Sequence, residues 1–70
     1  MSLLAVVNGE PRELPSPCTL AGVLDQLGVR ADGRGVAVAV DDEVVPRSKW
    51  ATTSLSPGSR IEVLTAVQGG

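Results

Sequence analysis

The sequence predicts a small α+β domain in which a mixed sheet of about five strands carries one helix on one face. Three observations lead to this fold class. Short apolar or alternating runs at both ends of the chain indicate strands. One run with helical apolar spacing lies between them, over residues 20–27. The chain then closes on Gly69-Gly70, a thin, pliable pair after the last strand.

The first two strands are expected to form a hairpin at one edge of the sheet. Residues 3–7 are an apolar run, and residues 10–14 return as the antiparallel partner. Asn8-Gly9 between them is a dipeptide that type I′ hairpin turns favour. Pro11 has no N–H to donate to a neighbouring strand, which places the second strand at an edge.

A single amphipathic helix is expected to begin after Thr19 and to end before Gly28. The Thr19 hydroxyl can cap the first turn, and glycine is the usual residue just past a helix end. The apolar residues of its buried face recur at i, i+3, i+4 and i+7: Leu20, Val23, Leu24 and Leu27. Gly22 destabilises a helix by about 1 kcal/mol relative to alanine, and close packing against the sheet would explain why glycine is present at this position.

The second half of the chain supplies the remaining strands. Residues 35–40 alternate Val and Ala, residues 43–45 follow a tight turn, and residues 60–66 alternate as the last strand. Polar residues 30–34 predict a loop, and residues 47–51 a helical turn. The first and last strands are apolar, so we expect them to pair in parallel at the sheet centre. One domain over 1–66 and a flexible tail over 67–70 follow.

Composition excludes several classes of function. The net charge is −2, the six basic residues are scattered, and Trp50 is the sole aromatic residue. Nucleic acid is therefore not an expected partner, because the chain has neither a basic stripe nor a stacking platform. The apolar start is too short to span a bilayer and lacks a basic segment, so no membrane segment is expected and the protein should be cytoplasmic.

The inventory of reactive residues is equally sparse. There is no histidine to act as a base or metal ligand, and no metal site is expected. Cys18 stands alone, which excludes a disulfide and fits a reducing compartment. It is interpreted as a small apolar filler, with a reactive thiol as the alternative because a helix start is near. Trp50 is expected to close one end of the core.

Two motifs of the second half are specific when taken together. They are Val-Pro-Arg-Ser-Lys-Trp at 45–50 and Ala-Val-Gln-Gly-Gly at 66–70. With the order of elements and the diglycine end, they resemble the ubiquitin-like β-grasp proteins, and among these the thiamine-biosynthesis sulfur carriers, the ThiS family. The resemblance covers essentially the whole chain. Asp41 and Ser59 depart from the family pattern, but both lie in turns, where Asn, Asp and Ser serve alike.

The resemblance implies a carrier that is not itself an enzyme and binds no cofactor. An E1-like adenylyltransferase would use ATP to adenylate the Gly70 carboxylate. A persulfide, supplied from cysteine by a cysteine desulfurase or another donor, would convert the adenylate to a thiocarboxylate. Thiazole synthase would then receive the sulfur. Gln68 and Gly69 would thread through the narrow channel of the enzyme.

The resemblance also requires a docking surface beside the tail. The candidate is an apolar patch on the open sheet face, formed by Ala37, Ala39, Leu64, Ala66 and Val67. The alternative is that these are ordinary half-covered strand residues. Arg47 and Lys49 could pair with an acidic partner surface, but a solvated face is the simpler interpretation.

Other functions fit the same tail. The small subunit of molybdopterin synthase shares the fold and the thiocarboxylate chemistry, although its usual tail sequence is missing here. A carrier for another sulfur pathway, such as cysteine synthesis or tRNA thiolation, is a further alternative. A ubiquitin-like protein modifier would form isopeptide bonds on lysines instead. In a plain β-grasp interaction module the diglycine would be incidental.

Overall fold

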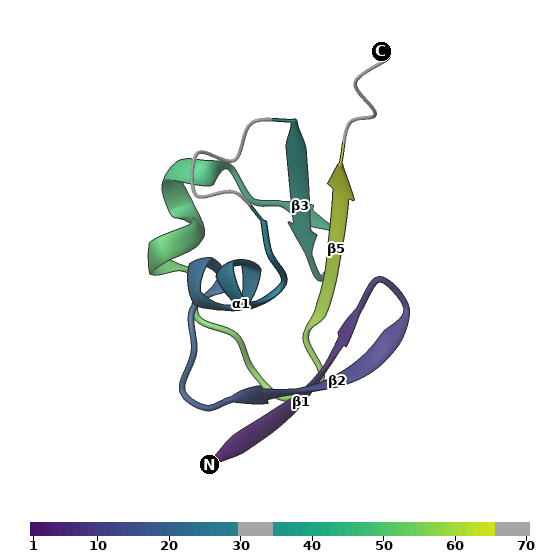
Figure 1. The fold of residues 1–70 in the computed structure, drawn as a ribbon, viewed down its shortest axis with the longest axis vertical. Helices are drawn as coiled ribbons and strands as arrows, with labels where there is room; N and C mark the ends of the chain where they lie inside the picture. The colour runs from purple at the N-terminus through teal and green to yellow at the C-terminus, as the bar shows by residue number, and fades with distance from the viewer. Residues whose placement is uncertain (30–34, 66–70) are drawn as a thin grey trace.

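A mixed five-stranded sheet with the order β2-β1-β5-β3-β4 carries one α-helix on one face (Figure 1). The computed structural model describes residues 1–29 and 35–65. The strands are β1 (Ser2–Val7), β2 (Glu10–Pro15), β3 (Val36–Val40), β4 (Glu43–Val44) and β5 (Arg60–Thr65). The helical elements are α1 (Leu20–Gln26) and the 3₁₀ helix η1 (Arg47–Thr52). The predicted fold class is confirmed.

The first hairpin forms as its turn sequence predicts. β1 and β2 pair antiparallel from Ser2↔Pro15 to Val7↔Glu10. Asn8 and Gly9 both have positive φ, 50° and 83°, as a type I′ turn requires. β2 lies at the edge of the sheet, in agreement with the position of Pro11.

The parallel pair at the sheet centre is confirmed, but it is short. β1 and β5 are paired only at Val6↔Arg60 and Val7↔Ile61, because the chain of β1 then turns into the hairpin. Asn8 prolongs the contact beyond the strand: its N–H donates to the Ile61 carbonyl at 2.9 Å. Its Oδ1 accepts the Val63 N–H at 2.8 Å. One turn residue thus holds two successive groups of β5.

β3 lies antiparallel to β5 on the other side, from Val36↔Thr65 to Val40↔Ile61. A tight turn at Asp41 and Asp42, both with positive φ, leads into β4. β4 ends at Val44, one residue earlier than predicted. Pro46 cannot continue a ladder, and the Val45 carbonyl accepts the Trp50 indole N–H at 2.9 Å instead of a strand partner.

α1 begins and ends close to the predicted residues. The Thr19 hydroxyl accepts the Gly22 N–H at 3.3 Å, Leu27 is the C-cap, and Gly28 follows with φ 83°. The proposed reason for Gly22 was wrong, because Gly22 is exposed and does not touch the sheet. A Cβ there would meet only the Thr19 Oγ1, at an ordinary 3.6 Å. The sheet contact of the helix is made by Val23 and Leu24, its buried residues beyond Leu20.

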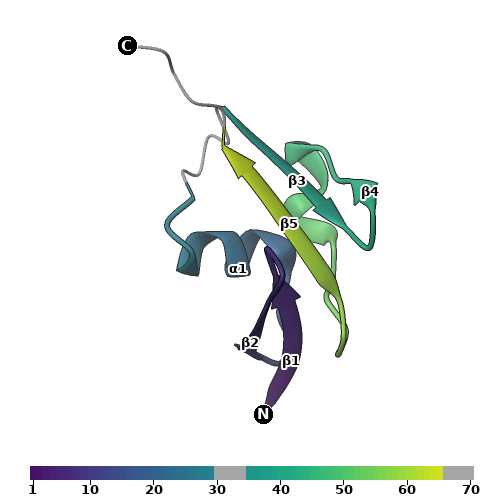
Figure 2. The same ribbon diagram turned by 90° about the vertical axis from the view of Figure 1, so that its right-hand side faces the viewer.

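The core fills the space between the sheet and the helical elements. Its buried hydrophobic residues are Leu3, Ala5, Val7, Leu14, Leu20, Val23, Leu24, Val38, Trp50, Leu55 and Ile61. Trp50 is 6% exposed and belongs to η1, so it closes the core from a second helical element, as predicted. The opposite face of the sheet, called the open face below, is covered by none of the described helical elements and is turned toward the viewer in Figure 2.

Three predictions fall outside the described residues. They are the loop over 30–34, the domain boundary at residue 66 and the tail over 67–70. β5 leads directly into the last of these, since Thr65 is both its final residue and the final described residue. The described part of the sheet therefore positions the start of the tail.

Candidate functional site

The candidate site consists of the C-terminal tail and the sheet surface beside it. Ala66, Val67, Gln68, Gly69 and Gly70, all singled out from the sequence, lie outside the described residues. Thr65 just before them is exposed and lies opposite Val36 in the antiparallel register. The β3–β5 ladder thus runs up to the residue before the tail, so the sheet determines the position from which the tail starts.

Three predicted docking residues are brought together on the open face. Leu64 lies directly across from Ala37 in the antiparallel register, so both side chains project from the same face. Ala39 follows two residues later on the same face of β3. Leu64 is 67% exposed, Ala37 is exposed and Ala39 is half-buried. An uncovered leucine beside small residues leaves room for an apolar side chain of a partner.

The register adds a fourth residue that the sequence reasoning missed. Val44 pairs with Ala39 across the β3–β4 ladder and is 77% exposed. Pairing through two ladders therefore joins Leu64, Ala37, Ala39 and Val44 into one surface, called the apolar strip below. The signal for Val44 was present in the sequence, because the two-residue turn at Asp41-Asp42 determines which residues pair.

The charged side chains of the same face lie around this strip. Glu62 pairs with Ala39 from the β5 side and is exposed, and Arg60 precedes it on the same face of β5. Arg47 and Lys49 are exposed but belong to η1, which packs against α1 on the covered side of the sheet. They are not members of the apolar strip, although Lys49 lines a pocket together with Val44 at the β4 end of it. Their exposure is consistent with the solvated interpretation.

Comparison with known proteins identifies the family. A model of the ThiS family matches residues 5–70. The chain belongs to the ThiS family. The predicted identification as a thiamine-biosynthesis sulfur carrier is thereby confirmed.

Relatives and solved structures agree with this membership. The sulfur carrier protein ThiS of Thermus thermophilus is 38% identical over 64 residues, which cover 91% of this chain and 95% of that protein. The crystal structure of ThiS from Geobacter metallireducens superposes with a TM-score of 0.79 at 27% identity, covering 97% of this chain and 100% of that one. The ubiquitin-like β-grasp fold is therefore shared.

One relative of the ThiS-family chain is a much larger protein. A thiazole synthase of Paramagnetospirillum magneticum is 37% identical over 65 residues. The match covers 93% of this chain but only 19% of that protein, so the chain spans about a fifth of its length. In that organism a ThiS-like stretch and a thiazole synthase are thus parts of one polypeptide.

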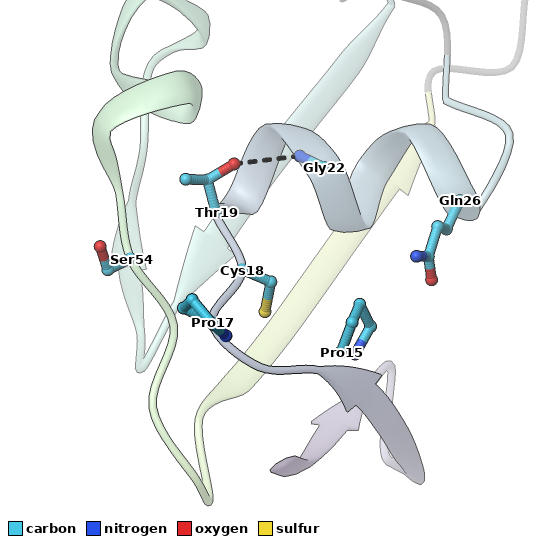
Figure 3. Close-up of a pocket in the computed structure, with 7 residues that line it drawn as sticks. All are labelled: Pro15, Pro17, Cys18, Thr19, Gly22, Gln26 and Ser54. Carbon is cyan, nitrogen blue, oxygen red and sulfur yellow. Dashed lines mark hydrogen bonds between the residues drawn. The ribbon is translucent and has the colours of Figure 1, made fainter. Parts of the chain in front are cut away.

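Cys18, the other candidate reactive group, lies away from the apolar strip. It is half-buried and packs against the core, which supports its interpretation as a filler. Figure 3 shows it lining a pocket of about 440 Å³ beside α1. The other lining residues are Pro15, Pro17, Thr19, Gly22, Gln26 and Ser54, none of which is charged. No cation near the thiol in this pocket would activate it.

The described residues of this ThiS-family chain contain no group of three or more His, Cys, Asp or Glu side chains that could hold a metal ion. Within the same part of the chain, no helix has the length and apolar character needed to cross a bilayer.

Proposed function

We propose that this protein carries sulfur for thiazole formation in thiamine biosynthesis, with the Gly70 carboxylate as the carrier group. The observation that supports this assignment best is the match to the ThiS family model, which continues through Gly70 itself. The whole tail therefore falls within the family pattern. The proposal requires Gly70 to bear a free carboxylate.

The proposed chemistry begins with activation of an unreactive group. An α-carboxyl group titrates at about 3.3–3.7, so it is an anion and a poor electrophile at neutral pH. The Gly70 carboxylate oxygen attacks the α-phosphorus of ATP on an E1-like adenylyltransferase, and pyrophosphate leaves. The resulting acyl-adenylate is a mixed anhydride, and its carbonyl carbon accepts a nucleophile.

Sulfur then replaces the adenylate. The terminal sulfur of a persulfide, derived from a cysteine desulfurase or another donor, attacks the Gly70 carbonyl and AMP leaves. The product is an acyl disulfide, whose S–S bond is cleaved by a second thiol to give the thiocarboxylate and a disulfide. Thiazole synthase receives this sulfur. The thiazole synthase relative that contains a ThiS-like stretch supports that partnership.

The chain's own part in these steps is to present the tail, and it supplies no catalytic side chain. The absence of histidine from the whole sequence supports this assignment, since histidine is the side chain whose ordinary pKa suits a general base near neutral pH. The apolar strip is the proposed binding surface for the partner enzymes, and β5 connects that surface to the tail. We propose a cytoplasmic location, because a lone cysteine fits a reducing compartment.

The test is the intact mass of the chain after incubation with ATP, a sulfur source and soluble extract of the host. We expect a mass gain equal to sulfur replacing oxygen, localised to Gly70 by fragmentation. A matched chain that lacks Gly70 should show no gain. An unchanged mass, in an extract that converts a known carrier, would overturn the proposal. Covalent attachment to lysines of other proteins would indicate a protein modifier instead.

A further inference from the structure

The tail-bearing strand β5 has a free edge close to the tail. β3 accompanies β5 along five residue pairs, whereas β1 pairs with it only at Arg60 and Ile61. Figure 2 shows β1 beside only the lower part of β5, with β3 along its length. Among residues 1–29 and 35–65, the upper part of β5, over residues 63–65, therefore has a strand on one side only.

The groups left free on that edge follow from the alternation of a strand. Successive residues direct their N–H and C=O groups to opposite neighbours, so Ile61, Val63 and Thr65 face the side of β1. Asn8 binds the Ile61 carbonyl and the Val63 N–H, at 2.9 Å and 2.8 Å. Among the described residues, nothing pairs with the next two groups, the Val63 carbonyl and the Thr65 N–H. Asn8 thus ends the internal ladder, and the sheet stays open above it.

The outer edges of the sheet are protected, in contrast to this one. β2 carries Pro11 and Pro15 together with charged residues, which are common means of blocking strand addition. β4 has only two residues and is soon followed by Pro46. Within the described part of the chain, residues 63–65 are therefore the edge where an extended partner segment can join with the fewest obstacles.

We propose that an extended segment of thiazole synthase adds to β5 at residues 63–65, accepting the Thr65 N–H and donating to the Val63 carbonyl. This inference rests on the proposed function. The choice of occupant rests on the relative in which a ThiS-like stretch and a thiazole synthase share one polypeptide, since the two parts are covalently joined there. Strand addition is a common way to bind an exposed sheet edge.

Backbone pairing at this position would set how far the tail reaches. Gly70 lies five positions after Thr65, and a fully extended chain of that length spans at most about 18 Å. A clamp on Thr65 would therefore determine the depth at which the Gly70 thiocarboxylate enters thiazole synthase. The apolar strip on the open face would contribute binding affinity. Backbone pairing at the edge would fix the position of the tail along the partner segment.

The test removes one N–H from the edge and measures the Kd of purified thiazole synthase for the chain. Thr65→Pro deletes that donor and spares the ladder to β3, because Leu64 and Glu62, not Thr65, face β3. Thr65→Ala is the matched control, since it removes the side chain and keeps the donor. We expect the Kd to rise about five- to tenfold for Thr65→Pro and to stay within about twofold for Thr65→Ala.

A second version of the test is independent of proline's effect on folding. Chemical synthesis of the 70-residue chain allows an ester bond in place of the Leu64–Thr65 amide, which deletes the N–H without a proline ring and weakens the Leu64 carbonyl as an acceptor. The free energy of unfolding of the ester chain reports any weakening of the ladder to β3. An unchanged Kd for the ester chain would overturn the proposal. A loss confined to adenylation would also overturn it and assign the edge to the adenylyltransferase. If the unaltered chain never gains sulfur at Gly70, the proposed function fails instead, and the mass measurement distinguishes that case.

Discussion

Asn8 and Val63 are 55 positions apart in the chain, yet the Asn8 Oδ1 accepts the Val63 N–H at 2.8 Å. A turn residue of the first hairpin thereby takes the place of a strand partner for β5. The positive φ of Asn8, 50°, is a conformation that asparagine adopts more readily than most residues. The same residue therefore makes the hairpin turn and holds the strand that leads to the tail.

Substitution of Asn8 should separate these two contributions. Asn8→Gly keeps the turn and loses the acceptor, so it should lower the free energy of unfolding by about 1 kcal/mol. Asn8→Ala loses the acceptor and also strains the turn, for a total of about 2 kcal/mol. Urea denaturation followed by circular dichroism measures both. Equal stability of the alanine variant and the unaltered chain would contradict this role.

Gly22→Ala should stabilise the protein. The new Cβ would meet only the Thr19 Oγ1 at 3.6 Å, and alanine is favoured over glycine within a helix by about 0.8–1 kcal/mol. Gly28→Ala is the matched control, because φ at Gly28 is 83° and alanine is strained there. We expect thermal unfolding to shift up for the first and down for the second. A destabilised Gly22→Ala variant would show that this glycine has a role beyond its backbone.

Leu64→Ser should weaken binding to the partner enzymes without unfolding the domain. Leu64 is 67% exposed, so its loss should change the free energy of unfolding by no more than about 0.5 kcal/mol. Partner Kd should rise about three- to tenfold, as apolar contact is lost. Leu4→Ser is the control, because Leu4 is a similarly exposed leucine, at 60%, outside the apolar strip. It lies on β1, and its carbonyl accepts the N–H of Gly58, which precedes β5 in the chain. Equal effects of the two changes would argue against the apolar strip.

Gly69→Val should block adenylation while the domain stays folded. Branched bulk beside the terminal residue prevents the tail from lying in a narrow channel, and small misplacement of a reacting group costs about a hundredfold in rate. Release of pyrophosphate in the presence of the adenylyltransferase measures the step. Gly69→Ala, with one added methyl group, should lose much less. A normal rate for the valine variant would rule out steric exclusion in the channel.

Several features were predictable because they depend on residues near one another in the chain. The Asn8-Gly9 turn, the Thr19 cap and the glycine after α1 were each expected and each formed. The order of elements and the diglycine motif also led to the correct family. The reason for Gly22 was misjudged, although the helical spacing of the apolar residues over 20–27 already places position 22 outside the buried face.

Features that depend on strand register were harder to predict from the sequence. The inclusion of Val44 in the apolar strip follows from its pairing with Ala39, and that pairing depends on the exact turn between β3 and β4. The early end of β4 reflects competition for the Val45 carbonyl, which the Trp50 indole takes. The tight turn at Asp41-Asp42 was expected, but the pairing of Val44 with Ala39 was not worked out from it, and the hydrogen bond of the Trp50 indole is not visible in residue types alone.

By itself the sequence determined the class of fold, the hairpin and helix ends, the family and the chemistry available to a chain without histidine, because these depend on local conformational preferences and on residue inventory. The tertiary structure decided which exposed side chains share a surface and where the sheet remains open. Both depend on how far β1 runs beside β5 before Asn8 turns it away. That distance arises from packing the two ends of the chain together, so only the folded molecule reveals it.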